Sequence, residues 1–253
     1  MEGKLIMLKS KMKNISIVLY KPKYAGNVGS VARAAKNMGI GDIIIVGTDD
    51  FDREEMQQRS THLAADVLDK IRYCENIREA LGNFNYIVGT TARLGKARGP
   101  FVSPRAMADD IVKISQKNKV ALLFGPEDTG LANDQMRFCQ SVVTIPTSRE
   151  FTSLNLSHAV MILCYELFVA SSGKARDTGE LVPTLARSNE LEGMYGQTKT
   201  LLADIGFLNP ENPDYWMMHL RRFFTRAGIL SREVKIVRGI CRQIEWYAHH
   251  KKT

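Results

Sequence analysis

The sequence predicts an α/β fold with a parallel sheet over residues 1–172, followed by a small helical domain. Five short runs are rich in Val, Ile or Leu and lack alternating polar residues, as expected of strands that helices cover on both faces. These runs cover residues 14–20, 42–47, 85–90, 119–125 and 141–146. Helical patterns lie between them, for example over 104–117 and 131–140. The alternation of strand and helix is typical of a parallel sheet.

The pattern changes after residue 172. A nearly all-apolar helix is predicted over residues 154–170, and the Gly, Ser, Pro and mixed charges of 173–187 indicate a linker. From 188 to 253 the pattern is helical only, with apolar stripes between residues 191 and 205, 216 and 224, and 234 and 244. The Met and aromatic residues of the second stripe are expected in a core. Residues 188–253 are therefore interpreted as a separate helical extension.

The composition is that of an ordinary globular protein, with 44% hydrophobic and 25% charged residues. No apolar run reaches the roughly 18 residues that span a bilayer, and the N-terminus lacks the apolar core of a signal peptide. The four cysteines, at positions 74, 139, 164 and 241, lie far apart and form no CxxC pair. This spacing favours reduced thiols and a cytoplasmic location.

The positive charge of the chain is concentrated near its C-terminus. The net charge is +8, and residues 219–253 hold nine Lys and Arg against two Glu, which accounts for +7 of it. A region this basic is typical of a surface that binds the phosphates of a nucleic acid. The alternative is a solvated helix face that serves only solubility.

The stretch GNVGSVAR, residues 26–33, follows the first predicted strand and begins a helix. A dinucleotide-binding turn needs three glycines in G-x-G-x-x-G spacing, and only Gly26 and Gly29 are present. Asp49 and Asp50 lie about twenty residues further on, where a ribose-binding acid would stand, so this interpretation stays open. Alternatively, Arg33 shares a polar helix face with Gly29 and binds a phosphate or carboxylate beside the open glycine backbone. A surface ion pair is the third possibility for Arg33.

Three further segments follow predicted strands at their carboxyl ends. They read GTTAR (89–93), FGPEDTGLANDQM (124–136) and IPTSREFTSLNLSHAV (145–160). Open parallel α/β sheets bind ligands at this edge. The segments offer small residues, exposed backbone amides and hydroxyl groups, so they predict a shared ligand site.

With these motifs the chain resembles the SpoU/TrmH branch of the SPOUT methyltransferases. That branch transfers a methyl group from S-adenosylmethionine to a ribose 2′-OH of RNA. Its three motifs correspond, in order, to GNVGSVARA, LLFGPEDTGL and IPTSREFTSLNLSHAV, and the resemblance covers about 160 residues. The C-terminal part, HLRRFFTRAGILSREVKIVRGICRQIE, resembles the TrmJ family within this branch, which methylates cytidine or uridine at nucleotide 32 of tRNA.

The resemblance implies more than the pattern shows. It implies a C-terminal trefoil knot in the sheet domain and a homodimer with its sites at the subunit interface. S-adenosylmethionine is then expected to contact Thr90, Thr91, Ala92, Gly125, Ile145, Thr152, Ser153 and Leu154. The catalytic residues are expected to be Arg33, Asn27, Ser153 and Asn155. RNA is expected to bind Arg93 and, in the basic extension, Arg221, Arg222 and Arg226.

The chemistry of methyl transfer sets limits on these roles. The reaction needs an oxygen nucleophile aligned with the methyl group and no metal, and the sequence shows no His/Cys/Asp cluster that would hold one. Arg33 is a poor base, because a guanidinium is effectively always protonated, and a good clamp for a phosphate or a developing alkoxide. We rank it as an electrostatic positioner first and a base second.

Other side chains in these motifs have two interpretations each. His158 is either a base or a structural histidine near a helix start. Glu127 either contacts the cofactor or a partner subunit, or supports its loop by accepting backbone hydrogen bonds. Ser153 could serve only as a helix N-cap.

The leading function is a tRNA ribose 2′-O-methyltransferase. The alternatives are an rRNA 2′-O-methyltransferase, a non-catalytic RNA-binding protein with the same fold, and a nucleotide-binding oxidoreductase. The missing third glycine disfavours the oxidoreductase, and the presence of Arg33, Ser153 and Asn155 disfavours the non-catalytic protein.

Overall fold

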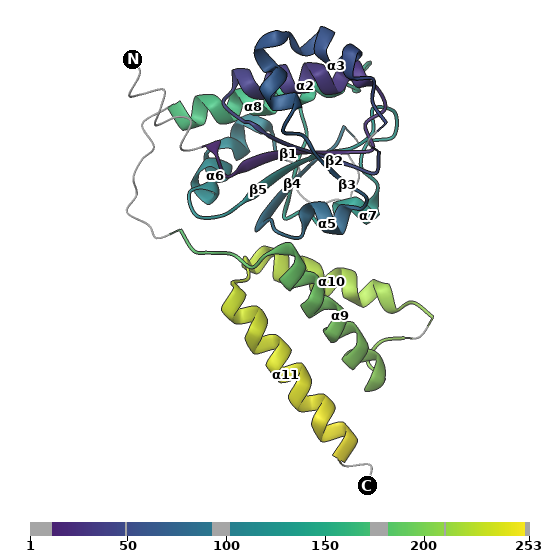
Figure 1. Ribbon diagram of the computed structural model, residues 1–253. Helices are drawn as coiled ribbons and strands as arrows, with labels where there is room; N and C mark the ends of the chain where they lie inside the picture. The colour runs from purple at the N-terminus through teal and green to yellow at the C-terminus, as the bar shows by residue number, and fades with distance from the viewer. Residues whose placement is uncertain (1–11, 49, 93–101, 173–181, 210, 251–253) are drawn as a thin grey trace. The chain divides into compact units, whose positions relative to one another are not determined.

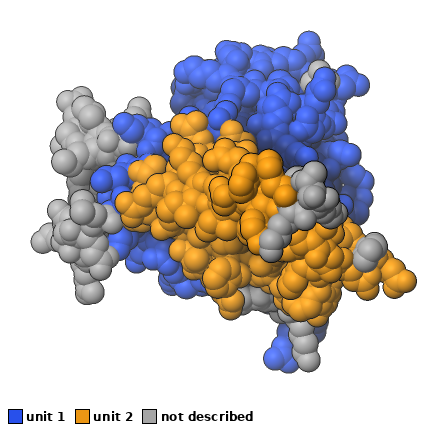
Figure 2. Space-filling view, turned by 90° about the horizontal axis from the view of Figure 1, so that it is seen from below, with its two compact units in different colours: residues 1–182 blue, residues 183–253 orange. Residues whose placement is uncertain are grey.

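The computed structural model describes residues 12–48, 50–92, 102–172, 182–209 and 211–250. The chain forms two compact units, Met1–Val182 and Pro183–Thr253 (Figure 2). We describe each unit by itself. Within the described residues, no helix is both long and apolar enough to cross a membrane.

The first unit is built on a sheet of six parallel strands in the order β3-β2-β1-β5-β4-β6 (Figure 1). The strands are β1 Ile15–Tyr20, β2 Asp42–Val46, β3 Arg72–Cys74, β4 Tyr86–Thr90, β5 Val120–Phe124 and β6 Ser141–Val143. Five of them are the predicted runs, and the prediction of a parallel sheet is confirmed. The sequence did not predict β3, a three-residue edge strand that is largely exposed.

Helices cover both faces of this sheet, as Figure 1 shows. Side chains of β1 alternate between two cores: Ile17 and Leu19 face one core, and Val18 faces the other. The first core also contains residues of α2 (Ala25–Asn37), α3 (Arg53–Ser60), α4 (Ala65–Leu68), α6 (Pro104–Ser115) and α8 (Leu156–Ser172). A short 3₁₀ helix, His62–Ala64, precedes α4, and the second core is covered by α5 (Ile77–Leu81) and by the segment around α7 (Asn133–Met136).

Helix α2 crosses α3 at very close range. A Cβ atom on Gly29 would lie 2.1 Å from the carbonyl oxygen of Met56 in α3, so only glycine fits at this crossing. Val28, Ala32 and Ala35 of α2 are fully buried in the first core. Gly29 therefore serves helix packing, and the interpretation that it leaves the backbone open to a phosphate is wrong.

The described residues of the second unit form three helices, α9 (Ser188–Asp204), α10 (Pro213–Ala227) and α11 (Ser231–His250). Its core contains Ala186, Met194, Tyr195, Leu208, Met217 and Val234. The carboxylate of Glu190, in the first turn of α9, accepts hydrogen bonds from the Arg187 backbone N–H and the Ser231 hydroxyl, and so joins the starts of α9 and α11. Of the aromatic stripe expected in the core, Trp216 and Phe223 are about half exposed.

Candidate active site

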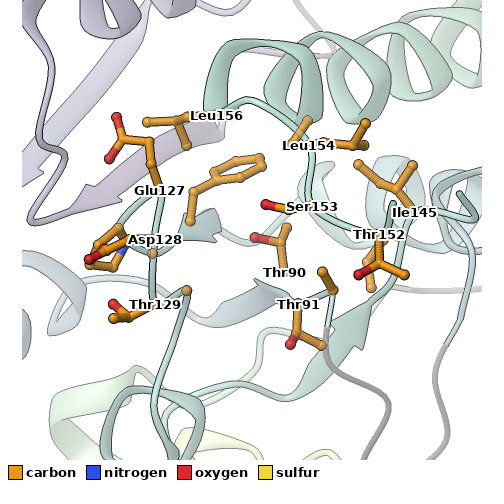
Figure 3. Close-up of a pocket in the computed structure, with 17 residues that line it drawn as sticks. Thr90, Thr91, Glu127, Asp128, Thr129, Ile145, Thr152, Ser153, Leu154 and Leu156 are labelled. Atoms are coloured by element: carbon orange, nitrogen blue, oxygen red, sulfur yellow. The ribbon is translucent and has the colours of Figure 1, made fainter. Parts of the chain in front are cut away.

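The three predicted segments surround one hollow at the carboxyl ends of β4, β5 and β6 (Figure 3). Thr90 ends β4 and Thr91 follows it, the segment from Gly125 to Gly130 follows β5, and Ile145 and the residues from Thr152 to Leu154 follow β6. All eight residues expected to contact S-adenosylmethionine line this hollow: Thr90, Thr91, Ala92, Gly125, Ile145, Thr152, Ser153 and Leu154. Hydroxyl groups and apolar side chains alternate around it. We call it the donor hollow.

The segment from Gly125 to Gly130 is a tight turn that packs on itself. The Gly130 N–H donates to the Pro126 carbonyl oxygen (2.8 Å), and Gly130 adopts a left-handed conformation with φ of 61°. A Cβ atom on Gly125 would lie 2.4 Å from the carbonyl carbon of Gly130 and 2.5 Å from the Leu131 nitrogen. Gly125 is therefore required by the turn itself, in addition to lining the hollow.

Residues that follow β1 form hydrogen bonds and an ion pair with this turn. Glu127 accepts hydrogen bonds from the Lys23 backbone N–H (3.0 Å) and from Nδ2 of Asn27 (2.8 Å). Lys23 Nζ forms an ion pair with Asp128 (2.5 Å). This hydrogen bond raises the pKa of Lys23 and lowers the pKa of Asp128, so both groups stay charged near neutral pH. The hydrogen bond from the Lys23 backbone supports the interpretation that Glu127 stabilises its loop. Glu127 also lines the donor hollow.

A chain of side-chain amides joins all three motifs. Nδ2 of Asn155 donates to Oδ1 of Asn27 (2.9 Å), and Oδ1 of Asn155 accepts from the backbone N–H (2.9 Å) and the hydroxyl (2.7 Å) of Ser157. An ionised carboxylate only accepts hydrogen bonds, so Glu127 fixes which end of the Asn27 amide faces it. That choice in turn fixes the Asn155 amide. Asn155, rather than Ser153, caps the first turn of α8.

A second hollow borders this chain of amides, and both Asn27 and Asn155 line it. It is wider than the donor hollow, about 790 against 240 Å³, and shares three lining residues with it: Glu127, Ser153 and Leu154. Asn27, Asn155 and His158 also line it, together with Tyr24, Arg59 and Phe151. We call it the acceptor hollow. Two ligands, one in each hollow, would meet at the shared wall.

A carboxylate of the protein itself, that of Glu55, binds the N-terminus of α2. The Gly26 N–H donates to Oε1 of Glu55 (3.1 Å), and a Cβ atom on Gly26 would lie 2.9 Å from this oxygen. A dinucleotide-binding turn would place a pyrophosphate at such a helix start. The dinucleotide interpretation is therefore not supported. Asp49, one of the two acids considered for a ribose, lies outside the described residues.

The predicted arginines are placed very differently. Arg33 is exposed on α2 and lines neither hollow. Arg93 lies outside the described residues. Arg221 is held within the second unit, because its guanidinium binds the carboxylate of Glu192 through two nitrogens and lies 4.2 Å from the ring centre of Tyr195. Arg222 and Arg226 are exposed on α10, where RNA could reach them.

Sequence reasoning missed Tyr24, Arg59 and Phe151, which border the acceptor hollow. Phe151 stands inside the third motif, so an exposed aromatic beside Ser153 was a signal that could have been used. Arg59 gave no such signal. It lies on α3, outside every motif, and reaches the hollow only because α3 packs so closely on α2.

Comparison with known proteins identifies the first unit. A sequence model of the SpoU rRNA Methylase family matches residues 14–165. The chain belongs to the SpoU methylase family. A model of the tRNA methyltransferase TrmJ C-terminal domain matches residues 189–253. The predicted resemblance to the SpoU/TrmH branch, and to TrmJ within it, is confirmed.

Relatives of this SpoU methylase match along most of their length. The tRNA (cytidine/uridine/adenosine-2′-O-)-methyltransferase TrmJ of Pseudomonas aeruginosa is 37% identical over 236 residues, which are 89% of this chain and 91% of that protein. The tRNA (cytidine/uridine-2′-O-)-methyltransferase TrmJ of Salmonella typhimurium is 36% identical over 242 residues, with 92% and 97% covered.

Solved structures agree with this SpoU assignment. The crystal structure of TrmJ from Z. mobilis has a TM-score of 0.78 at 28% identity, and the match covers 91% of this chain and 98% of that one. A probable methylase family protein from Haemophilus influenzae has a TM-score of 0.61 at 28% identity, with 95% and 99% covered.

Proposed function

We propose that the protein is an S-adenosylmethionine-dependent tRNA ribose 2′-O-methyltransferase of the cytoplasm, which modifies cytidine or uridine at nucleotide 32. The observation that carries this proposal is the common wall of the two hollows. Glu127, Ser153 and Leu154 line both. A methyl donor in one hollow and a ribose in the other would meet there, as a direct transfer requires.

The donor hollow fits S-adenosylmethionine chemically. Leu154, Leu156 and Ile145 offer apolar contacts for the adenine, and the hydroxyl groups of Thr90, Thr91 and Thr152 offer partners for its polar groups. Two acids, Glu127 and Asp128, lie on the opposite turn. When bound, S-adenosylmethionine supplies an electrophilic methyl group, whose bond to sulfur breaks as the ribose oxygen forms the new carbon–oxygen bond and the sulfur leaves as a neutral thioether.

Residues of the acceptor hollow and of the common wall orient the ribose. The ribose hydroxyl releases its proton to solvent water as the new carbon–oxygen bond forms, and hydrogen bonds from the protein hold its oxygen in line with the methyl group. The amides of Asn27 and Asn155 are locked in one orientation by Glu127, and the Ser153 hydroxyl reaches both hollows. These groups hold the ribose oxygen toward the donor, and much of the rate acceleration comes from this alignment.

Arg33 acts outside the hollows of its own subunit, on the RNA backbone or at the site of a partner subunit. The proposal includes a homodimer, in which the exposed apolar side chains of α8 are covered by a second copy. Tyr165 and Val169 are about half exposed and lie on the same helix face as His158. It also includes the trefoil knot of the family, and tRNA docking by the basic second unit, including Arg222 and Arg226 and, from the first unit, Arg93.

The test is incubation of the protein with radiolabelled S-adenosylmethionine and either total tRNA or ribosomal RNA, followed by mapping of the labelled nucleotide. We expect a 2′-O-methyl group at nucleotide 32 of tRNA. Label in ribosomal RNA alone would show that the substrate is rRNA rather than tRNA. Binding of tRNA without transfer of label, in a protein that binds the cofactor, would show a non-catalytic RNA-binding protein.

A further inference from the structure

We propose that Arg59, Tyr24 and Phe151 form the subsite for the acceptor nucleotide within the acceptor hollow, with Arg59 on the phosphate next to the methylated ribose and the two rings on the base. The inference rests on the proposed function, because it assigns residues to the RNA side of the same reaction. All three residues lie outside the catalytic and cofactor positions that the motifs predict. They come from three separate segments that the fold brings to one hollow.

Arg59 has the charge and freedom that a phosphate contact needs. It is exposed on α3, and the described residues include no ion-pair partner for it, whereas Arg53 of the same helix is paired with Asp69. Glu55, one helical turn before Arg59, also lines the hollow, and its carboxylate accepts the Gly26 N–H at the start of α2. Within the described residues the Arg59 guanidinium thus borders the hollow without an ion-pair partner, as a phosphate contact requires.

The stem of Arg59 is positioned by the close packing of α3 on α2. A Cβ atom on Gly26 would lie 3.5 Å from Cγ and 3.7 Å from Nε of Arg59, so the side chain runs along the backbone of the first motif. Asn27, the next residue, lines the acceptor hollow and donates a hydrogen bond to Glu127 of the common wall. A phosphate bound by Arg59 would place its attached ribose close to that wall. Arg33, in contrast, lines neither hollow.

Tyr24 and Phe151 supply the stacking surfaces. These two residues are 60% and 76% exposed, and both border the acceptor hollow, so a base in it could reach their rings. Tyr24 directly precedes α2, and Phe151 stands two residues before Ser153, with its backbone N–H bonded to the Ser148 hydroxyl (3.2 Å). RNA-modifying sites read nucleotides that leave the helical stack, and aromatic rings compensate for the stacking that the base loses. The acceptor is thus an unpaired loop nucleotide.

The phosphate contact is tested on the full-length protein with Arg59→Ala, Arg59→Lys and the matched control Arg53→Ala. All three are measured for cofactor affinity by calorimetry and for KM and kcat with the RNA that the wild type methylates. Arg59→Ala should raise KM about ten- to a hundredfold, as expected for a lost charge-assisted hydrogen bond. It should also reduce the slope of log affinity against log salt by about one.

In the same measurements, Arg59→Lys should keep the salt slope and recover part of KM. Cofactor affinity should stay unchanged in all three variants, and Arg53→Ala should match the wild type throughout. Equal KM values and salt slopes for Arg59→Ala and Arg53→Ala would overturn the phosphate contact.

The stacking contact is tested with Phe151→Ala, Phe151→Leu and Phe151→Tyr. Alanine and leucine should each weaken RNA binding about five- to a hundredfold, and tyrosine should restore it, because only an aromatic face stacks on a base. A leucine variant equal to tyrosine would show that bulk suffices and would overturn the stacking role. If the wild type methylates RNA, and Phe151→Ala and Arg59→Ala bind and methylate that RNA as the wild type does, the subsite alone is refuted. A wild type that transfers no methyl group to either RNA would refute the proposed function and the subsite together.

Discussion

Nδ2 of Asn155 donates a hydrogen bond to Oδ1 of Asn27 across 2.9 Å, and this contact joins segments that are 128 positions apart in the sequence. Its direction is set by Glu127, which accepts from the other end of the Asn27 amide. The three motifs are thereby connected through side chains as well as through the sheet. The consequences of this arrangement can be tested by removing its acceptor.

Glu127→Ala should lower kcat on the order of ten- to a hundredfold. The Asn27 amide would lose the charged acceptor that fixes it, a contact worth about 1.5–3 kcal/mol, and would rotate away from Asn155. The effect should appear at saturating donor and RNA concentrations, measured with radiolabelled cofactor. Glu54→Ala, which removes an exposed carboxylate that lines neither hollow, is the control. A normal kcat for Glu127→Ala would mean that the amides need no external acceptor.

Gly125→Ala should weaken cofactor binding through the turn rather than by filling the hollow. The added methyl group would collide with the backbone of Gly130 and Leu131, and turn backbone moves less easily than a side-chain end. Calorimetric titration should therefore show a clear loss of S-adenosylmethionine affinity. Gly39→Ala is the control, since Gly39 adopts a positive φ, lies in open space and lines neither hollow. It should lower thermal stability and leave affinity intact.

Arg221→Ala and Arg226→Ala should have opposite profiles. Arg221 is only 20% exposed and is bound to Glu192 and the Tyr195 ring, so its loss leaves a poorly exposed carboxylate without its partner and should destabilise the second unit by about 3 kcal/mol. Arg226 is exposed in the last turn of α10, so its loss should weaken tRNA binding and leave stability unchanged. Differential scanning calorimetry and salt-dependent tRNA titrations measure the two effects. An unchanged melting temperature for Arg221→Ala would contradict the structural role.

A protein that ends at residue 182 should bind the cofactor normally and tRNA poorly. It keeps the sheet unit with both hollows and loses residues 219–253, which account for +7 of the net charge. The remaining tRNA binding should depend less steeply on salt, because fewer counterions are released. Light scattering should first establish the oligomeric state, since the comparison requires the same assembly. Equal affinity and salt slope in the two proteins would remove the second unit from RNA docking.

Mixed dimers would locate the action of Arg33. Arg33→Ala and Asn155→Ser each should abolish most activity, and the serine still caps α8. If Arg33 serves the partner's site, a dimer with one copy of each variant contains one intact site and should recover up to about half of the activity. If Arg33 works in its own subunit, every site carries a defect and no recovery is expected. Co-purification with two different tags supplies the mixed dimers.

Much of this fold was readable from the sequence, because buried parallel strands carry a strong signal. The run DIIIVG became β2 and KVALLFG became β5, each within one residue or so at either end. The edge strand Arg72–Cys74 was missed, since it pairs on one side only and its polar exposed residues resemble a loop. The helix predicted over 131–140 shrank to Asn133–Met136, with turns around it.

In the candidate site, too, some residues could be placed from the sequence and others could not. Thr90, Gly125 and Ser153 could be placed together because they lie at or after the carboxyl ends of neighbouring parallel strands, which meet at one edge of the sheet. Arg59 and the role of Gly29 could not be predicted, because both depend on the distance between two helices that are joined by a strand and a loop. Helix-to-helix distances follow from tertiary packing, and no local pattern records them.

The common wall has a thermodynamic consequence. A group that lines two hollows cannot respond to one ligand without changing the other hollow, so the occupancies of donor and acceptor become coupled. Such coupling is reciprocal: whatever factor the cofactor applies to RNA affinity, the RNA applies to cofactor affinity. Glu127 is the residue that would carry this cooperativity, because it belongs to the turn that lines the donor hollow and it also orients the amide of Asn27 in the acceptor hollow. Spent cofactor, which lacks the methyl group at the wall, would then also change how tightly the product RNA is held.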